Sequence, residues 1–491
     1  MSDRSPNSGR PGRSGRSGRP GRPGRSGSSR SSGGSGRSAV VLGGGLAGVL
    51  TAQALSGLAD VTVVERDGLP TGPASRKGLP QARHVHLLWS GGAEAVEELL
   101  PGTINRLLAR GAHRLALPDD MIGFSPQGWL RRWAGEHYML LSSRDLLDAT
   151  LRAEVLASER VTLRQHTEVL GLTGDGSTVA GVRVRDREGV QSTLRADLVV
   201  DTTGRSSRAA GWLRSLGLPP VPERTVSSGL VYASRLYRAP EAARGGFPAV
   251  NIQADPRGPG PGRAGTLVLI EDGRWHVTLS GTTGGAPSAR NDAFEPFARG
   301  LRHPVLADLI ADAEPLDDVV LTRATANRRH YYERARRWPD GFAVLGDAVA
   351  AYNPIYGHGM SVAAQSARAL RAVVRRRGWG TPGLARHVQR AVAGPVAVAW
   401  DLATGQDVFY PGATPNGPTL RERATAAYVD RLMHTATGNG RIARELTRVT
   451  SMEDGPLLLL KPSVLLAAVR GPLRPPLGGP PLTPAERGAV G

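Results

Sequence analysis

The stretch AVVLGGGLAGVLTAQAL, residues 39–55, restricts the possible folds of this chain more than any other. An apolar run ends at Gly43, and the spacing Gly43-x-Gly45-x-x-Gly48 leads into helix-forming Ala and Leu residues. A second apolar run, VTVVE, ends at Glu65, about 20 residues later, as in the strand–turn–helix–strand unit that binds dinucleotides. There the glycines permit a tight turn, a close approach of pyrophosphate and close helix–strand packing. The motif predicts a Rossmann-like domain in which Glu65 binds a ribose hydroxyl.

A second glycine-containing stretch, GDAVAAYNPIYGHGM, occupies residues 346–360. A buried-strand pattern stops just before Asp347, and Gly357 and Gly359 precede a helical pattern over about 359–376. We expect Asp347 to bind the ribityl or pyrophosphate part of a flavin dinucleotide, and the helix N-terminus to face the flavin ring. The two glycines lack a β-carbon and so leave room for a flat ring. No second G-x-G-x-x-G has a strand–helix context, which favours one tightly held FAD over a visiting nicotinamide.

The order of patterns predicts an α/β fold with an α+β insertion. It combines a Rossmann-like FAD-binding domain, an antiparallel-sheet substrate domain and a helical C-terminal region. The predicted parts are a disordered Arg/Gly/Ser-rich tail (1–37), a discontinuous FAD-binding domain (38–220 and 320–380), a substrate-binding sheet domain (221–319), a helical region (381–475) and a Pro/Gly tail (476–491). Helices are also expected over 92–116 and 144–158.

The pattern changes to alternation between residues 226 and 280. The clearest case is GTLVLIEDGRWHVTLSG, residues 265–281, which predicts two strands joined at Asp272-Gly273. In the second strand, side chains starting with Trp275 and recurring every two residues share one face. Such a sheet is suited to cover the reactive face of a flavin.

Four further segments carry a resemblance to a known family. They are RKGLPQARHVHLLWSGG (76–92), LVVDTTGRSSR (198–208), IEDGRWHVTLSGT (270–282) and NPIYGHGMS (353–361). Together with the glycine motifs they resemble the flavin-dependent epoxidases of polyether ionophore biosynthesis, such as those of the lasalocid and monensin pathways. These are flavoprotein monooxygenases related to squalene epoxidase. The similarity covers about residues 38–475 and leaves out the basic tail.

The resemblance implies FAD as cofactor, O2 as cosubstrate and epoxidation of several alkenes on a linear polyene polyketide through a C4a-hydroperoxyflavin. The polyketide can be presented on an acyl carrier protein, and an epoxide hydrolase then opens the epoxides into ether rings. Cofactor-binding residues expected from the motifs and the resemblance are Gly43, Gly45, Gly48, Glu65, Arg66, Arg144, Asp347, Gly357, Gly359 and Met360.

One position departs from the pattern of related hydroxylases. Those enzymes often have Asp-Gly after the LVV strand, where this chain has Thr203-Gly204, with Asp201 two residues earlier. In hydroxylases this region contacts both FAD and NADPH. The electron source therefore stays open between NADPH itself and a partner flavin reductase.

Flavin-borne chemistry needs no catalytic triad or metal, because the cofactor carries the hard step. No metal site is expected, and no catalytic residue is assigned with certainty; His84, His86 and Tyr356 are the weaker candidates. The histidines of RHVHLLW belong either to a loop near flavin or substrate or to ordinary structure. A polyene is expected to need a long apolar trough, whose candidate lining residues are Phe124, Trp129, Trp133, Tyr232 and Trp275.

The net charge is +19, and cysteine is absent, which excludes disulfides and thiolate chemistry. The Arg-rich tail admits a different class of function, nucleic-acid binding, but it lacks aromatic residues for base stacking, so nucleic acid is an unlikely partner. A basic surface would instead attract an acidic carrier protein.

A flavin halogenase is disfavoured because only Lys77 and Lys461 could relay hypohalous acid. A hydroxylase or single epoxidase of another polyketide or terpenoid is the nearer alternative. No apolar stretch has the length of a membrane span, so a cytoplasmic protein is expected.

Overall fold

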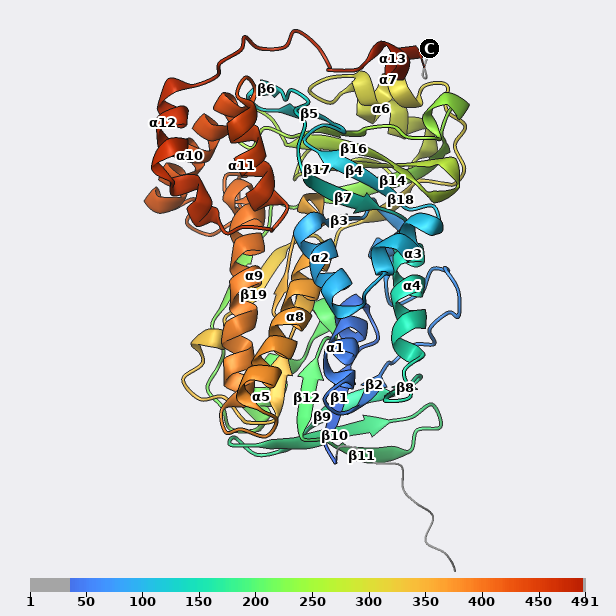
Figure 1. The fold of residues 1–491 in the computed structure, drawn as a ribbon, viewed down its shortest axis with the longest axis vertical. Helices are drawn as coiled ribbons and strands as arrows, with labels where there is room; N and C mark the ends of the chain where they lie inside the picture. Colours follow the sequence, from blue (N-terminus) through green and yellow to red (C-terminus); the bar gives the residue numbers. More distant parts are fainter. Residues whose placement is uncertain (1–35, 489–491) are drawn as a thin grey trace, which may run out of the picture. The chain divides into compact units, whose positions relative to one another are not determined.

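The computed structural model describes residues 36–488, so the predicted disordered tail lies almost entirely outside the described residues (Figure 1). Its first element is a five-stranded parallel sheet. In spatial order the strands are β20 (Phe342–Val344), β12 (Leu198–Asp201), β1 (Ser38–Leu42), β2 (Asp60–Val64) and β8 (Val161–Arg164). The three strands β20, β12 and β1 are nearly continuous apolar runs, as expected for strands buried on both faces, whereas the edge strand β8 is partly exposed. The Rossmann-like prediction is confirmed.

Helices bury one face of this sheet, and they pack on one another as well (Figure 1). They are α1 (Leu46–Ser56), α2 (Ser90–Leu99), α4 (Arg144–Leu156), α8 (Gly359–Arg377) and α9 (Leu384–Asp407). Close packing of α2 on α8 depends on a small residue, since a β-carbon at Gly92 would lie 2.3 Å from Ser361 Oγ. A three-stranded sheet, with β9 (Glu168–Gly174), β10 (Val179–Arg185) and β11 (Gln191–Arg195), packs against β12, and α5 (Ala209–Ser215) follows β12 in the chain.

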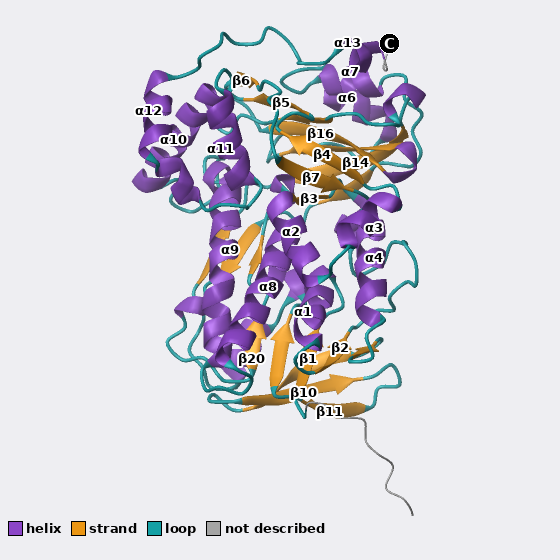
Figure 2. Ribbon diagram, viewed as in Figure 1, coloured by secondary structure: helices purple, strands orange, loops and turns teal. Residues whose placement is uncertain are grey.

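A seven-stranded sheet forms the second large element (Figure 2). In spatial order its strands are β18 (Val320–Thr322), β14 (Val231–Arg238), β17 (Arg274–Gly281), β16 (Arg263–Ile270), β15 (Ala249–Ile252), β5 (Met121–Ser125) and β6 (Gly128–Trp129). The predicted hairpin is confirmed, because β16 and β17 pair antiparallel from Ile270↔Arg274 onward. The sheet also takes two strands from residues 121–129, which the sequence places next to the dinucleotide-binding segments.

The two faces of the seven-stranded sheet have different coverings. Trp275 and its alternating neighbours Val277 and Leu279 face a hydrophobic core shared with α6 (Phe294–Arg299) and α7 (Val305–Ile310). On the opposite face a second core joins it to the antiparallel strands β3 (Leu87–Trp89), β7 (His137–Leu141) and β4 (His113–Leu117). A small sheet of β13 (Glu223–Val226), β19 (Asn327–His330) and β21 (Ala350–Ala351) connects this region to α8.

The expected helix over 92–116 is wrong in part. The segment forms α2, then α3 (Thr103–Ala109), and ends in strand β4. Pro101-Gly102 interrupts the helix, because Gly102 adopts the left-handed φ of 82°.

The C-terminal region is helical, as predicted. After α9 come α10 (Leu420–Ala436), α11 (Gly440–Thr450), α12 (Pro462–Arg470) and α13 (Pro484–Gly488). The last of these falls in the predicted Pro/Gly tail and is fastened by Arg132, whose Nη1 lies 2.7 Å from Glu486 Oε1. Within residues 36–488 no helix has the length and apolar character needed to cross a membrane.

Candidate functional site

The first glycine motif forms the turn between β1 and α1. Gly43 has the left-handed φ of 96°, and its N–H donates to Val64 O at 2.8 Å. A β-carbon on Gly48 would lie 1.8 Å from Gly43 O, so the helix approaches the turn as closely as glycine allows. Helix α1 begins after Gly45, whose N-cap position has no side-chain hydrogen bond. The first N–H groups of α1 are therefore available to an anion, such as a phosphate.

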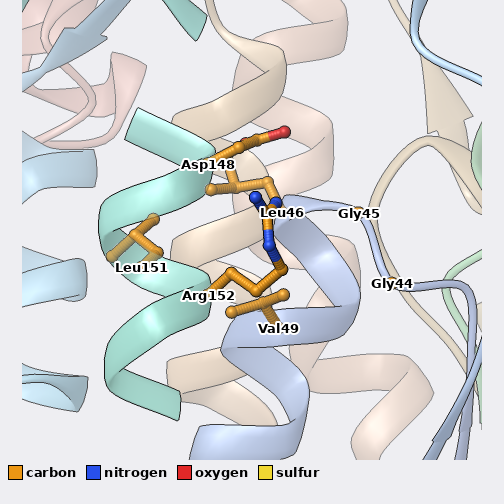
Figure 3. A pocket seen from close by; sticks show the side chains of 7 residues that line it. All are labelled: Gly44, Gly45, Leu46, Val49, Asp148, Leu151 and Arg152. Atoms are coloured by element: carbon orange, nitrogen blue, oxygen red, sulfur yellow. The ribbon is translucent and has the colours of Figure 1, made fainter. Parts of the chain in front are cut away.

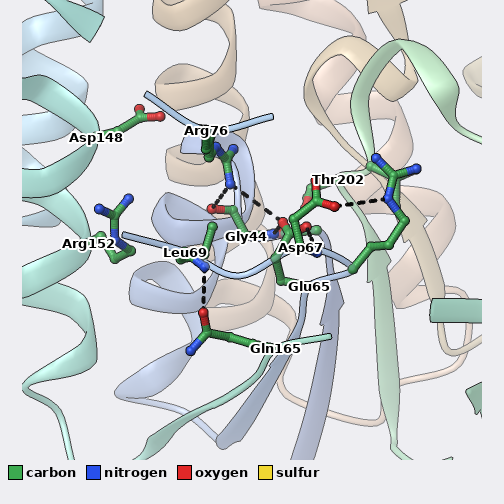
Figure 4. Close-up of polar contacts among 12 residues, drawn as sticks. Gly44, Glu65, Asp67, Leu69, Arg76, Asp148, Arg152, Gln165 and Thr202 are labelled. Atoms are coloured by element: carbon green, nitrogen blue, oxygen red, sulfur yellow. Dashed lines mark hydrogen bonds and ion pairs between the residues drawn. The ribbon is translucent and has the colours of Figure 1, made fainter. Parts of the chain in front are cut away.

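Glu65 follows β2 and points back to this turn (Figure 4). Its Oε2 accepts a hydrogen bond from Gly44 N at 2.7 Å, and its Oε1 accepts one from Asp67 N at 2.9 Å. Each carboxylate oxygen keeps a second lone pair for another donor, such as a ribose hydroxyl. Arg66, by contrast, has a side chain that is 67% exposed and pairs with Asp67, so it lies outside this cluster.

Arg76 is a site residue that the motifs did not predict. Its Nη1 lies 3.6 Å from Glu65 Oε2 and 3.4 Å from Gly44 O, and a β-carbon on Gly45 would be 3.3 Å from its Nη2. The buried Nε has no partner. A cation held over the glycine turn is suited to bind a pyrophosphate. Arg76 reaches this turn through a loop and not at a fixed spacing from the glycine motif, so the motif does not predict it. It is the first residue of the segment RKGLPQ.

A narrow hollow lies where α1 and α4 meet at this turn (Figure 3). Its lining residues are Gly44, Gly45, Leu46, Val49, Asp148, Leu151 and Arg152. Arg144, the first residue of α4, is buried, and its Nε donates to Asp148 Oδ1 at 2.7 Å. Asp148 and Arg152 of α4 therefore line the hollow beside the glycine motif, and Arg144 is joined to it through Asp148.

The second motif meets the first at the carboxyl ends of the parallel strands. Gly346 has a φ of 64°, and a β-carbon there would lie 2.9 Å from Ala47 Cβ. Asp347 Oδ2 is 4.0 Å from Arg205 Nε. Burial raises the pKa of the Asp347 carboxyl, while the charges of Arg205 and Arg144 lower it. The structure thus brings Asp347 next to the glycine turn and within electrostatic reach of Arg144, from three distant parts of the chain.

Gly357 precedes α8 and Gly359 is its first residue, and Gly357 has a requirement for glycine beyond the flat ring expected from the sequence. Its φ of 67° is left-handed, and a β-carbon would lie 3.0 Å from Leu87, so backbone geometry and a packed loop require glycine there. Gly359 is more open, because only Asp347 Oδ1, at 3.6 Å, lies near its missing β-carbon. Met360 lines a hollow together with His86 and Leu87.

Asp201, the acidic residue displaced from the hydroxylase pattern, turns inward. It accepts hydrogen bonds from Thr203 N at 2.9 Å, Thr203 Oγ1 at 2.6 Å and Ser207 Oγ at 2.6 Å. It is fully buried and shapes the turn that positions Arg205. Arg205 in turn donates to Ala326 O at 3.0 Å and to Tyr352 O.

The two candidate histidines lie in the loop before β3, beside the second motif. His86 Nδ1 donates to His84 O at 2.8 Å. Burial, with nearby arginine charge, lowers the pKa of His84 to about 4 and that of His86 to about 3. Both rings are therefore neutral at pH 7. No group of three or more metal-ligating side chains occurs among the residues that the structure describes.

His358 gives a direct test of this burial. It is stacked on Trp89 at 5.7 Å, and burial lowers its pKa to about 4. The unfolded chain takes up a proton on this histidine near pH 6.5, whereas the folded chain does so only near pH 4. The contribution of neutral His358 to the free energy of unfolding is therefore fully present above pH 6.5 and is lost toward pH 4. We expect the destabilisation caused by His358→Asn to shrink below pH 6.5 by up to about 1.4 kcal/mol per pH unit. Urea unfolding at pH 7.5, 6.0 and 5.0 measures it; a difference that does not change with pH contradicts it.

The predicted substrate residues do not gather in one place. Tyr232 OH donates to Asn353 Oδ1 at 2.8 Å, which brings it next to the second motif. Trp275 is fully buried against Phe247 on the far face of the sheet. Phe124 and Trp129 pack together at 4.6 Å near the sheet edge. Trp133 packs under Gly440 and is covered by Arg474.

Tyr356, the remaining candidate, belongs to a buried polar network. Its OH donates to Asp407 Oδ1 at 2.9 Å, and Asp407 Oδ2 accepts from Asn353 Nδ2 at 2.9 Å and Asn327 Nδ2 at 2.7 Å. These side chains come from three separate segments, and no local pattern predicts that they meet. The network holds the loop in front of α8.

Comparison with known proteins agrees with this arrangement. A family model described as FAD binding domain matches residues 37–256. Protein Rv3254 of Mycobacterium tuberculosis (strain ATCC 25618 / H37Rv) is 30% identical over 443 residues, which is 87% of this chain and 91% of that protein.

Two solved structures show the same fold. The p-nitrophenol 4-monooxygenase PnpA from Pseudomonas putida DLL-E4 is 18% identical, with a TM-score of 0.60 over 86% of this chain and 99% of that one. The flavin-dependent brominase Bmp2 is 16% identical, with a TM-score of 0.61 over 88% of this chain and 98% of that one. The fold thus accommodates different chemistries, and the activity must be argued from the site. The matched domain, the extended similarity to the mycobacterial protein and the two glycine turns identify the chain as a member of the FAD-binding-domain family of flavoprotein monooxygenases.

Proposed function

We propose that the protein is an FAD-dependent monooxygenase that epoxidises alkenes of a linear polyene polyketide. In the balanced reaction an alkene, O2, a hydride donor such as NADPH and a proton give an epoxide, water and the oxidised donor. The observation that carries the proposal is the meeting of two distant glycine turns, Glu65, Arg144 and Asp347 at one edge of a parallel sheet. The four segments that resemble polyether epoxidases support the choice of reaction.

The residues present fit a flavin dinucleotide. The free N-terminus of α1 and Arg76 would hold the pyrophosphate, Glu65 the adenosine ribose, and Asp347 with Arg144 the ribityl side. When bound, the flavin supplies the activation of oxygen. Two observations support this fit. Arg76 Nε has no hydrogen-bond partner and can donate to a ligand, and the open backbone at Gly359 leaves space for one.

The chain itself contributes positioning and electrostatics. The N-terminus of α8 carries partial positive charge, which stabilises negative charge that develops nearby. The loop of His84 and His86 packs on the seven-stranded sheet and beside the start of α8, where it would limit the access of water. No protein nucleophile is required. Electrons would come from NADPH or from a partner flavin reductase. The burial of Asp201 supports the flavin reductase, because a buried carboxylate is unavailable to a visiting dinucleotide.

The partners follow from the same proposal. An acyl carrier protein is typically acidic, and the chain has a net charge of +19, so electrostatic attraction favours delivery of a carrier-bound chain. An epoxide hydrolase would consume the product.

One observation favours a second reaction, hydroxylation of a more polar substrate. The face of the seven-stranded sheet toward the His84 loop bears Tyr232, Ser234 and Thr278, three hydroxyl side chains that suit a more polar substrate than the apolar trough expected from the sequence. Halogenation is less well supported, because both lysines, Lys77 and Lys461, are exposed to solvent.

The experiment begins with the absorption spectrum of the purified protein and chromatography of the released cofactor. We expect FAD at about one equivalent. The holoprotein is then supplied with NADPH, or with a flavin reductase and NADH, and with polyene ketides of increasing length, and products are analysed by mass for gain of one oxygen per alkene. A colourless protein that takes up no FAD contradicts the cofactor assignment. Gain of oxygen at saturated or aromatic carbon only would replace epoxidation by hydroxylation.

A further inference from the structure

A row of polar side chains crosses the seven-stranded sheet. Ser234, Thr278, Thr266 and Asn251 are cross-strand neighbours on β14, β17, β16 and β15. Direct neighbours share a face, so the whole row lies opposite the core of Trp275. Ser234 and Thr278 are buried. Buried hydroxyls cost free energy unless paired, so their partners are informative.

The partners form a chain that ends at His84. Val85 N donates to Thr278 Oγ1 at 3.0 Å, Thr278 Oγ1 lies 2.6 Å from Ser234 Oγ, and Ser234 Oγ lies 2.7 Å from His84 Nδ1. The loop and the sheet face are thereby joined by three consecutive hydrogen bonds.

Counting unpaired donors and acceptors together favours one direction for this chain of hydrogen bonds. Thr278 Oγ1 already accepts from Val85 N, so its own hydrogen finds a partner if it donates to Ser234 Oγ. Ser234 then donates to His84 Nδ1, and both hydroxyl hydrogens are used. In the reverse direction both the Thr278 hydrogen and the lone pair of His84 Nε2 would lack a partner among the described residues, whereas the first direction leaves only the Nε2 hydrogen unpaired. Because His84 is neutral at pH 7, the remaining ring proton must lie on Nε2.

His84 Nε2 is buried and has no hydrogen-bond partner. The structure therefore presents an unpaired N–H donor on a side chain only 6% exposed. An unpaired buried donor is costly, by about 1–3 kcal/mol, and such groups in native proteins call for an explanation.

This donor lies beside the candidate flavin site. The rings of His84 and Tyr232 are 5.8 Å apart, and Tyr232 donates to Asn353, which opens the loop before α8. Two residues after His84, His86 lines the same hollow as Met360, the second residue of α8. The loop that carries His84 thus connects the start of α8 with the polar row.

We propose that His84, held by Ser234 and Thr278 with its proton on Nε2, donates a hydrogen bond to an acceptor oxygen of the substrate. This inference rests on the proposed function and specifies its substrate class: a molecule with a carbonyl or hydroxyl oxygen near the carbon that is oxygenated, rather than a pure hydrocarbon. A polyketide chain satisfies this requirement. His84 is then a specificity residue, and Ser234 is a positioning residue that acts through it.

The first test reads the tautomer without any substrate. Histidine labelled with 15N in the FAD-loaded protein reports which ring nitrogen carries the proton. We expect Nε2–H for His84, and a change of that pattern in Ser234→Ala. Ser280→Ala, at the last residue but one of β17 and on the same face as Thr278, is the matched control and should leave the pattern unchanged. A proton found on Nδ1 of His84 in the unsubstituted protein overturns the proposal.

The second test measures recognition of the oxygen. The probes are 2-acetylnaphthalene and 2-isopropenylnaphthalene, which have nearly the same shape but present C=O and C=CH2. Binding to the holoprotein is followed by the change of the flavin absorption spectrum. We expect the ketone to bind 2- to 10-fold more tightly, the net worth of one hydrogen bond.

Two substitutions distinguish the roles of the two ring nitrogens of His84. His84→Asn keeps a polar atom near the Nδ1 position and removes the Nε2 donor, so the preference for the ketone should disappear. His84→Gln places an amide N–H near the Nε2 position and should restore part of it. Equal binding of both probes to the unsubstituted protein, no binding of the ketone, or an unchanged preference in His84→Asn each overturns the inference. A protein without FAD instead overturns the proposed function, so the two failures are distinguishable.

Discussion

Gly48→Ala is expected to abolish stoichiometric FAD binding and to lower stability by about 3 kcal/mol, the upper part of the range for inserting a methyl group into a packed interior. The added β-carbon would lie 1.8 Å from Gly43 O and 2.9 Å from Thr202 Oγ1. A backbone carbonyl cannot move aside as a side chain can. Either α1 must move away from β1, or the turn that presents N–H groups to the pyrophosphate must change shape. Bound flavin per protein chain and urea unfolding measure the two effects.

Gly57→Ala is the matched control, because Gly57 follows the same helix and has nothing within 4 Å of the added β-carbon. Its φ of −76° suits alanine, so it should retain FAD and stability. Full FAD content in Gly48→Ala would show that the close approach of α1 to the turn is unnecessary for binding.

The glycine turns could be predicted from the sequence because each has a local physical requirement. Gly43 needs a left-handed φ, and Gly48 needs the space of its missing β-carbon. A pattern of strand, glycine spacing and helix contains those requirements within about 25 residues. The hairpin at Asp272-Gly273 was predictable for the same reason, since its turn and its alternation are both local.

Residues that join the site from distant segments could not be predicted in this way. Arg76 reaches Gly44 by a loop, and Arg205 reaches Asp347 after a turn that Asp201 shapes. Nothing in their neighbouring residues specifies that destination. The same limit applies to the expected apolar trough, because alternation predicts which residues of a strand share a face but not which face turns toward the cofactor. The face with Trp275 joined the core, and the face with Ser234 and Thr278 turned toward the loop of His84.

The expected helix over 92–116 failed for a different reason. Its composition favours helix, but Pro101-Gly102 stops it, and the following residues gain more by pairing β4 with β7. Tertiary pairing therefore outweighed local propensity.

Asp407→Leu is expected to destabilise the protein strongly, by about 4 kcal/mol or more, and to reduce its affinity for FAD. Asp407 is 2% exposed at the end of α9 and accepts hydrogen bonds from Tyr356, Asn353 and Asn327. Leucine of similar size would leave three buried donors unpaired, each at a cost of about 1–3 kcal/mol. Urea unfolding gives the change in stability.

The loss should extend to the flavin, because the network orients the loop in front of α8. Asn353 is held on one side by Asp407 and on the other by Tyr232, and its N–H donates to Asn327 Oδ1 at 2.7 Å. Without Asp407 the start of α8, with Gly359 and Met360, would lose its fixed position. A flavin titration followed by fluorescence measures the affinity, and the shape of the bound-flavin absorption band reports its surroundings.

Asp407→Asn separates charge from hydrogen bonding. Its amide oxygen can still accept from Asn353 and Asn327, and its NH2 group can donate to the Tyr356 oxygen, so only the Tyr356 hydrogen loses its acceptor. We expect it to lose less than half of the stability that Asp407→Leu loses and to keep FAD. Asp401→Leu, an exposed carboxylate on the same helix, controls for the loss of a charge and should leave both quantities unchanged. If Asp407→Leu binds FAD as tightly as the unsubstituted protein does, the loop is held by its glycine turns and packing alone, and the buried network serves only the stability of the fold.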